Sequence, residues 1–255
     1  MKTLVMAIQK GRQGKTFATC HLAFDFHERG LRIAVANMEI QGNASYTLEG
    51  HESGFATNRL ITGNPAELRK HFGGREDNGL VLIEADAPLA NVKSHMKAGE
   101  AATKLPANIK ALSEFFDMLL IDTPPFLGVI MTAAVVTSNY MLLPMEMEAY
   151  SLHGMNKMIA VIGDLRKQNP KLRFLDMVPN KVDARKPRHV GKLTDLRTAH
   201  PQLVTPISIG SRDSIAEALG EQRPVWKIKK TAARVATKEV RALAPQYVFE
   251  KMEIT

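Results

Sequence analysis

The 255-residue sequence contains one cysteine, few aromatic residues and no long apolar run. Cys20 alone cannot form an intrachain disulfide or supply the paired ligands of a zinc or iron–sulfur centre. No uninterrupted apolar stretch approaches the roughly 20 residues that a transmembrane helix requires. We therefore expect a cytoplasmic protein that has no membrane association and uses no cysteine chemistry.

Acidic residues are in the minority, because 34 lysines and arginines face 26 aspartates and glutamates, for a net charge of +8. This excess favours a polyanionic partner such as nucleic acid. Apolar residues make up 45% of the chain, which is enough for a full hydrophobic core. No linker rich in Pro, Gly or Ser and no internal repeat divides the sequence, so we expect one domain over residues 1–255.

A segment rich in glycine and basic residues, 10–16, lies between an apolar run at 4–8 and apolar-periodic residues at 17–26. This order predicts a buried strand, a tight loop and a helix. Loop N–H groups and the positive end of a helix dipole together bind phosphate. An ordinary basic turn is the alternative, which the Gly-Lys-Thr triplet at the strand–helix junction disfavours. We therefore expect nucleotide binding by Lys10, Gly11, Arg12, Gln13, Gly14, Lys15, Thr16 and Phe17, with Thr16 as a Mg²⁺ ligand.

The segment departs from the strict Walker A pattern, which requires glycine six residues before the lysine, where this sequence has Gln9. It fits the deviant form Lys-Gly-Gly-x-Gly-Lys-Thr instead, in which Lys10 is a second lysine. Arg12 stands at the position of the second glycine in that form.

A second candidate site residue, Asp122, directly follows the apolar run 118–121. This is the Walker B arrangement, in which the carboxylate holds a Mg²⁺-bound water at the end of a strand. The alternative is an Asp that caps the next helix. Further apolar runs predict strands near 31–36, 80–83, 140–144 and 174–178, and helices are expected near 15–29, 65–72, 109–116, 151–168, 190–199, 214–219 and 230–243. The fold class is therefore α/β, with a P-loop NTPase-like, mainly parallel sheet covered by helices on both faces.

The segment Asn180–Asp183 matches the Asn-Lys-x-Asp pattern that binds guanine in GTPases. Four residues are a weak signal, so ATP and GTP both remain open on this evidence.

A basic segment near the end of the chain contains Lys227, Lys229, Lys230, Arg234, Lys238 and Arg241. Four of these, at 230, 234, 238 and 241, are spaced to lie on one helical face. A solvated surface helix is the alternative, and the positive net charge together with the family resemblance described below favours non-specific binding of the DNA backbone.

These segments occur in the order found in the ParA/MinD group of deviant Walker ATPases, which the chain resembles along nearly its whole length. The resemblance is carried by these motifs and by five longer sequence segments, 1–5, 21–26, 41–48, 181–185 and 224–234. It implies a plasmid partition ATPase that uses ATP and Mg²⁺, forms a homodimer with nucleotide and binds DNA without sequence preference. It also implies a ParB-type (KorB-like) centromere-binding partner and association with the nucleoid.

Site roles follow from the same resemblance. Lys15 and Thr16 would bind the phosphates and Mg²⁺, Lys10 would reach the nucleotide of the other subunit, and Asp122 would be the Walker B carboxylate. Asn180 and Pro206 would lie beside the adenine.

The loop 37–43 would be switch I, where the group usually has Asp-x-Asp-Pro. This chain has Asn37, Glu39 and Ile40 at those positions. We expect Glu39 to position water and metal less well than Asp, so hydrolysis and dimerisation would be weakened. A nucleotide-gated DNA-binding module or corepressor partner without hydrolysis is the alternative.

Overall fold

The structure, a computed structural model, describes residues 1–8, 10–75, 79–92, 98–125, 128–147 and 152–254. Gln9, which precedes the predicted phosphate loop, and Ser151, the expected start of a helix, lie outside the described residues.

Parallel strands form the centre of the molecule. They are β1 (Lys2–Met6), β2 (Ile33–Asn37), β3 (Glu52–Ala56), β4 (Leu80–Glu84), β5 (Met118–Asp122), β6 (Tyr140–Glu146) and β7 (Arg173–Asn180). Within the described residues they make one seven-stranded sheet in the order β3-β4-β2-β5-β1-β6-β7, and every adjacent pair is parallel. The predicted α/β fold is confirmed.

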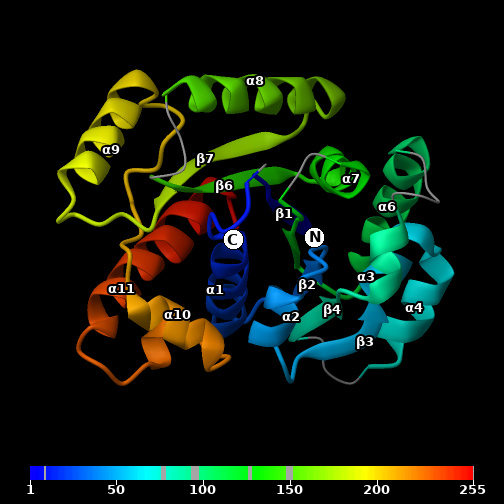
Figure 1. Cartoon of the computed structure of the whole chain (residues 1–255). Coiled ribbons are helices and arrows are strands. Elements are labelled where there is room, and N and C mark those ends of the chain that lie inside the picture. The colour runs from blue at the N-terminus through cyan, green and yellow to red at the C-terminus, as the bar shows by residue number, and fades with distance from the viewer. Residues whose placement is uncertain (9, 76–78, 93–97, 126–127, 148–151, 255) are drawn as a thin grey trace.

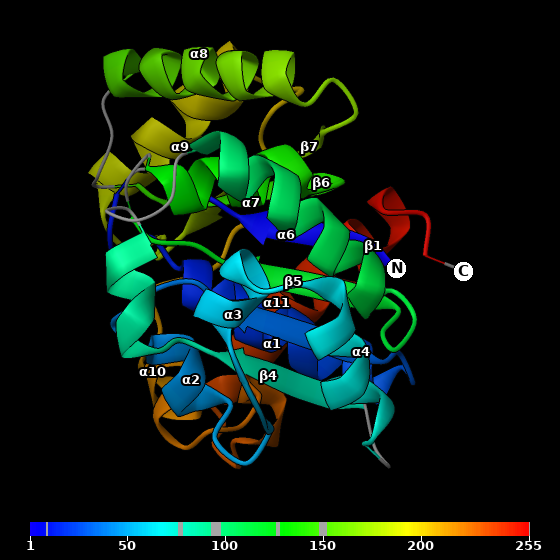
Figure 2. The same ribbon diagram turned by 90° about the vertical axis from the view of Figure 1, so that its right-hand side faces the viewer.

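The strands are apolar on both faces because helices cover both faces of the sheet (Figures 1 and 2). Along β1, Leu4 and Met6 face one apolar cluster and Val5 faces the other. The Leu4 face contacts α1 (Lys15–Glu28), α2 (Asn43–Thr47), α10 (Asp213–Gly220), α11 (Ala233–Arg241) and the π-helix η3 (Ala242–Phe249). The Val5 face contacts α3 (Thr57–Thr62), α4 (Pro65–Gly73), α6 (Ala98–Leu112), α7 (Val129–Thr137), α8 (Leu152–Gln168) and α9 (Pro187–Ala199).

Two short 3₁₀ helices complete the described elements, η1 (Ala87–Asn91) and η2 (Val225–Lys227). In the part of the chain that the structure describes, no helix is both long enough and apolar enough to cross a bilayer.

The structure differs from the sequence-based expectation in two regions. Residues 44–64, where the apolar pattern predicts neither a strand nor a helix, contain α2, β3 and α3. The edge strand β3 was missed because its sequence is polar and contains glycine, which is unfavourable in strands. Helix α6 begins at Ala98 and not near residue 109, because it tolerates Pro106, an exposed residue that usually ends a helix.

Candidate functional site

The candidate site lies where three central strands end at the same edge of the sheet. Met6 of β1 pairs with Asp122 of β5, and Asp122 pairs with Asn37 of β2. From β1 the chain continues to β2, which lies on the β5 side of β1, whereas β6 lies on the opposite side of β1. Open α/β sheets bind ligands in the crevice that forms where the strand order reverses in this way. A cavity of about 830 Å³ opens at this point, which is large enough for a nucleotide.

Most of the residues predicted to bind or act on a nucleotide line this one cavity. They are Lys10, Gly11, Arg12, Gln13, Gly14, Lys15, Thr16, Phe17, Glu39, Asp122 and Asn180. The exception is Pro206, which does not line the cavity and whose carbonyl accepts a 2.8 Å hydrogen bond from Arg197.

The loop between β1 and α1 is held by bonds to its carbonyl groups. The Gln13 side chain donates to the carbonyl of Gly11 (3.1 Å), Lys181 to that of Arg12 (2.9 Å) and Asn180 to that of Gln13 (2.9 Å). These bonds fix the orientation of the peptide groups that join residues 11–14. Phosphate binding by the N–H groups of this loop remains the prediction from the sequence pattern.

Two residues of the loop have left-handed backbone conformations. Gly14 has φ +101°, and a Cβ there would lie 2.1 Å from Nδ2 of Asn180, so only glycine fits. Arg12 has φ +61°, a conformation that is unfavourable for a side chain by about 1–2 kcal/mol. A glycine at position 12 would relieve this strain, which gives a structural reason for the glycine in the deviant pattern.

Lys15 and Asp122 are buried side by side at the base of the cavity. Burial lowers the pKa of Lys15, and the nearby carboxylates of Asp122 and Glu39 oppose that shift. Burial raises the pKa of Asp122 to about 6, although a hydrogen bond from Thr16 and the charge of Lys15 act in the opposite direction.

The Asp122 carboxylate has room for a cation. Its Oδ2 accepts a 2.7 Å hydrogen bond from Thr16 Oγ1, whereas Oδ1 is buried and has no hydrogen-bond partner. A buried carboxylate oxygen usually has a partner. This pair therefore fits Mg²⁺, which prefers oxygen ligands. No group of three or more His, Cys, Asp or Glu residues that could hold a metal alone occurs among the residues described.

The loop after β2 is organised by Asn37. This buried side chain donates to Ser45 Oγ (2.9 Å) and accepts from the backbone N–H of Glu39 (3.0 Å). Glu39 lines the cavity, and its Oε1 accepts a 3.3 Å hydrogen bond from the N–H of Gln41. Ile40 is 47% exposed. Asn37 thus holds the loop through an amide group and adds no charge.

The opposite end of the cavity contains residues that no sequence motif indicated. The N–H of Ser211 donates to the carbonyl of Val182 (3.0 Å), which places the segment 210–213 beside the end of β7. Residues of α2 and α10 also line the cavity, including Asn43, Tyr46, Ile215, Ala216, Leu219 and Gly220. The α10 residues lie far from the phosphate loop in sequence and form no local pattern, so only the fold reveals them, whereas Asn43 and Tyr46 belong to the segment 41–48 that carries the resemblance.

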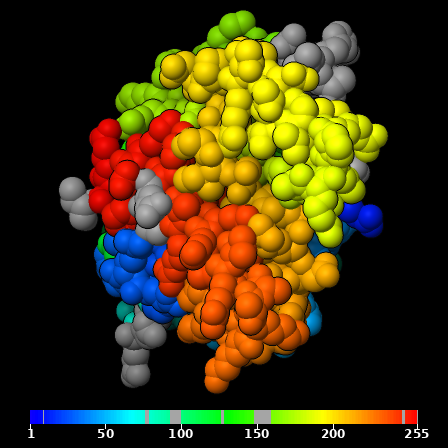
Figure 3. Space-filling model, turned by 90° about the vertical axis from the view of Figure 1, so that its left-hand side faces the viewer, coloured from blue at the N-terminus to red at the C-terminus, as the bar shows by residue number. Residues whose placement is uncertain are grey.

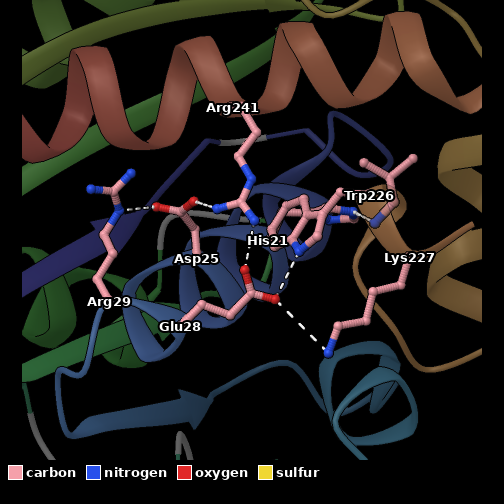
Figure 4. Close-up of polar contacts among 8 residues, drawn as sticks. His21, Asp25, Glu28, Arg29, Trp226, Lys227 and Arg241 are labelled. Carbon is pink, nitrogen blue, oxygen red and sulfur yellow. Dashed lines mark hydrogen bonds and ion pairs between the residues drawn. The ribbon is translucent and has the colours of Figure 1, made fainter.

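The basic segment does not form the single helical face that its spacing predicts. Helix α11 begins at Ala233, so Lys230 precedes it, and Lys230 makes a 2.5 Å ion pair with Glu217. Arg241 points inward, where it contacts the carboxylates of Asp25 and Glu28 of α1 (Figure 4). Its guanidinium carbon lies 3.9 Å from the ring centroid of Trp226.

The 3₁₀ helix η2 is bound to α1 by the same group of side chains. Trp226 Nε1 donates to Glu28 (2.8 Å), and His21 Nε2 accepts from the N–H of Val225 (3.2 Å) (Figure 4). Burial lowers the pKa of His21 to about 4, so His21 is neutral and can accept this bond. Lys227 lies 3.9 Å from Glu28. Three predicted DNA-binding cations, at 227, 230 and 241, are therefore ion-paired within the molecule.

Comparison with known proteins identifies the family. A family described as an AAA domain matches residues 1–174. Two Escherichia coli proteins, both named Protein IncC, align with the whole chain at 68% and 50% identity, and the alignments cover 70% and 71% of those proteins. This chain belongs to the IncC family. The chain is also similar to the chromosome-partitioning ATPase Soj of Thermus thermophilus, with 28% identity over 72% of this chain and 71% of Soj.

Solved structures support the fold of this IncC-family chain. The structure of a Cyanothece McdA variant in complex with ATP has a TM-score of 0.78 at 24% identity and covers 94% of this chain and 95% of its own. The cell division ATPase MinD of Pyrococcus furiosus has a TM-score of 0.70 at 20% identity and covers 96% and 99%. The seven-stranded sheet is thus the fold of the ParA/MinD group.

Proposed function

We propose that this IncC-family chain is a plasmid partition ATPase that binds Mg²⁺·ATP in the cavity at the end of β1. The observation that carries the proposal is the contact of Thr16 with Asp122, whose second oxygen is buried without a partner next to Lys15. Lys15 and the N–H groups of residues 12–14 would bind the phosphates. Thr16 and, through water, Asp122 would hold Mg²⁺, which would neutralise charge on the phosphate oxygens.

The proposal includes a homodimer across the mouth of the cavity. Lys10 lies on the exposed side of the loop, where it could reach the nucleotide of a second copy. Ile40 is 47% and Tyr46 is 57% exposed, and both belong to the segment that borders the cavity. A second copy seated there would bury these apolar surfaces, which favours association. A ParB-type protein would act as the partner that stimulates hydrolysis.

We expect hydrolysis to be weak because three residues disturb the reacting centre. Glu39 extends its carboxylate one methylene further than Asp, Asn37 contributes no charge, and Arg12 places a strained cation at the cavity. Replacing both Arg12 by Gly and Glu39 by Asp should raise the turnover number on the order of tenfold or more, because shifts of ~1 Å matter at reacting atoms. Steady-state phosphate release, with DNA and partner present, measures this.

The affinity for Mg²⁺·ATP should change much less than the turnover number in that double variant, because Lys15, Thr16 and Asp122 are retained. Equal turnover in the wild type and the double variant would show that the wild-type enzyme is not impaired.

DNA binding is proposed for the exposed part of the basic segment. Lys229, Arg234 and Lys238 are exposed and form no ion pair with any described residue. They belong to the segment 213–241, which lies on the same face of the molecule as α9 (Figure 3). DNA binding through this face would associate the protein with the nucleoid in the cytoplasm.

Three phosphate contacts predict that the logarithm of DNA affinity falls with the logarithm of salt concentration with a slope of about −3. Replacing Lys229, Arg234 and Lys238 by Ala should bring the slope close to zero. Lys230→Ala is the matched control, since Lys230 already pairs with Glu217, and it should leave the slope nearly unchanged. A slope that the triple replacement does not alter would place the DNA on another surface.

A DNA-binding module or corepressor partner that is gated by nucleotide but does not hydrolyse it is the second candidate. The changed residues Arg12, Asn37 and Glu39 favour it. Phosphate release and DNA binding measured on one sample separate the two: release supports the ATPase, and nucleotide-dependent DNA binding without release supports the module.

A further inference from the structure

Helix α10 extends along the cavity from one end to the other. Gly210–Asp213, at its start, lie beside the end of β7, because Val182 N–H donates to Ile209 (2.9 Å) and Ser211 N–H donates to Val182 (3.0 Å). Its last residue, Gly220, also lines the cavity, at the end bordered by α2. The segment 209–220, which ends with α10, therefore contacts both the residues next to Asn180 and the helix next to the switch loop.

One hydrogen bond joins α2 to the end of α10, and a second joins the residues that follow the two helices. The hydroxyl of Tyr46 donates to the carbonyl of Gly220 (3.2 Å), and the Gln222 side-chain amide donates to the carboxylate of Glu49. Tyr46 is 57% exposed, so burial of its ring contributes little to holding it there. The hydrogen bond of the Tyr46 hydroxyl is thus a polar contact at the exposed edge of the two helices.

The two ends of this connection lead to the two proposed activities. Helix α2 begins at Asn43, directly after the loop 37–42 that carries Glu39 and borders the proposed phosphate site. Helix α10 is followed by residues 221–232, which include η2 and lead into α11 and its exposed cations. A displacement of the switch loop would therefore reach α10 through Tyr46 and Gly220, and it would reach the basic segment through the ion pair of Glu217 of α10 with Lys230.

We propose that Tyr46 is a positioning residue that couples nucleotide occupancy at the switch loop to the placement of α10 and of the basic segment 227–241. The proposal rests on the function proposed above. In it, the hydroxyl of Tyr46 contacts neither phosphate nor base. It links the loop that senses the terminal phosphate to the helix that precedes the DNA-binding face, so that the two move together.

The test compares Tyr46→Phe with Tyr140→Phe. Tyr140 is a matched control because its hydroxyl also donates to a backbone carbonyl, that of Met252, at 3.2 Å, but away from the cavity. Affinity for a non-specific DNA duplex is measured with and without Mg²⁺·ATPγS, and affinity for Mg²⁺·ADP is measured separately. In Tyr46→Phe, the ratio of the two DNA affinities should fall about 3- to 10-fold, the effect of one hydrogen bond. Because Tyr46 lines the cavity, Mg²⁺·ADP affinity serves as the control for direct contact with nucleotide, and it should fall by a clearly smaller factor than the DNA-affinity ratio does.

Tyr140→Phe should change neither quantity, and Gln222→Ala should act in the same direction as Tyr46→Phe.

Backbone hydrogen exchange gives a second readout: Mg²⁺·ATPγS should protect residues 213–222 in the wild type and not in Tyr46→Phe. A wild-type DNA-affinity ratio and wild-type protection in Tyr46→Phe would overturn the coupling. An equal loss of Mg²⁺·ADP affinity would also overturn it, because Tyr46 would then contact nucleotide directly. Absence of all nucleotide binding by the wild type would instead refute the proposed function.

Discussion

Replacement of Gly14 by Ala should abolish nucleotide binding, while the same replacement at Gly30 should leave it intact. Both glycines have left-handed φ angles, +101° and +88°, so both variants carry backbone strain of about 1–2 kcal/mol. Only at Gly14 would the new Cβ meet another group, Nδ2 of Asn180 at 2.1 Å, whereas nothing lies within 4 Å at Gly30. The clash must displace the loop or break the bond between Asn180 and Gln13.

The expected loss of Mg²⁺·ATP affinity in Gly14→Ala is at least about 10²-fold, since displacements of ~1 Å have effects of that size at such sites. Gly30→Ala should lower thermal stability only. The double variant Gly14→Ala/Asn180→Ala removes the clash and keeps the strain, so it should recover part of the affinity. No recovery would mean that backbone strain, and not contact with Asn180, makes the glycine necessary. Calorimetric titration with Mg²⁺·ATP measures all four proteins.

Replacement of Asp122 by Asn should stabilise the nucleotide-free protein at pH 7.5 and remove the effect of Mg²⁺ on nucleotide binding. Burial raises the pKa of Asp122 from 3.8 to about 6, and each pKa unit corresponds to about 1.4 kcal/mol, so ionised Asp122 destabilises the fold by about 3 kcal/mol. Part of this gain is offset by an unpaired amide N–H₂ in the variant, which leaves about 1–2 kcal/mol. Urea unfolding measures the difference.

The pH dependence of this difference identifies its cause. Because the pKa of Asp122 is higher in the folded protein than its ordinary value of 3.8, protonation of Asp122 favours the folded state. This contribution to stability is fully present below pH 3.8 and is lost as the pH rises through 6. The advantage of Asp122→Asn should therefore disappear by about pH 4, where wild-type Asp122 is protonated. Asp25→Asn is the contrasting control, because Asp25 is buried between Arg29 and Arg241 and its replacement should destabilise the protein. Lower stability of Asp122→Asn at pH 7.5 would contradict the argument.

The sequence predicted the centre of the fold better than its borders. Strands such as β5 are continuous apolar runs because both faces of the sheet are covered, and their polar ends place Lys15 and Asp122 at one edge. The edge strand β3 has no such run, and α6 continues through Pro106 because that residue lies on the exposed side.

Site residues that form a short sequence pattern were predictable, whereas site residues contributed by segments distant in the sequence were not. The phosphate loop and Asp122 form recognisable local patterns. The contribution of α10 to the cavity depends on how residues about 200 positions away fold back, and the inward direction of Arg241 depends on Asp25 and Glu28 of α1. Helical spacing alone places a cation on a face but does not show which carboxylates that face meets.

The position of β1 in the sheet has a consequence for biosynthesis. Both of its neighbours come much later in the chain: β5 begins at Met118 and β6 at Tyr140. At roughly 5–20 residues per second, a ribosome needs roughly 6–20 seconds to reach β5 after it has made β1. During that interval the apolar strand Leu4–Met6 has no partner, and neither the loop after it nor the cavity can form. We expect nascent chains that end before residue 118 to be retained by chaperones and unable to bind nucleotide.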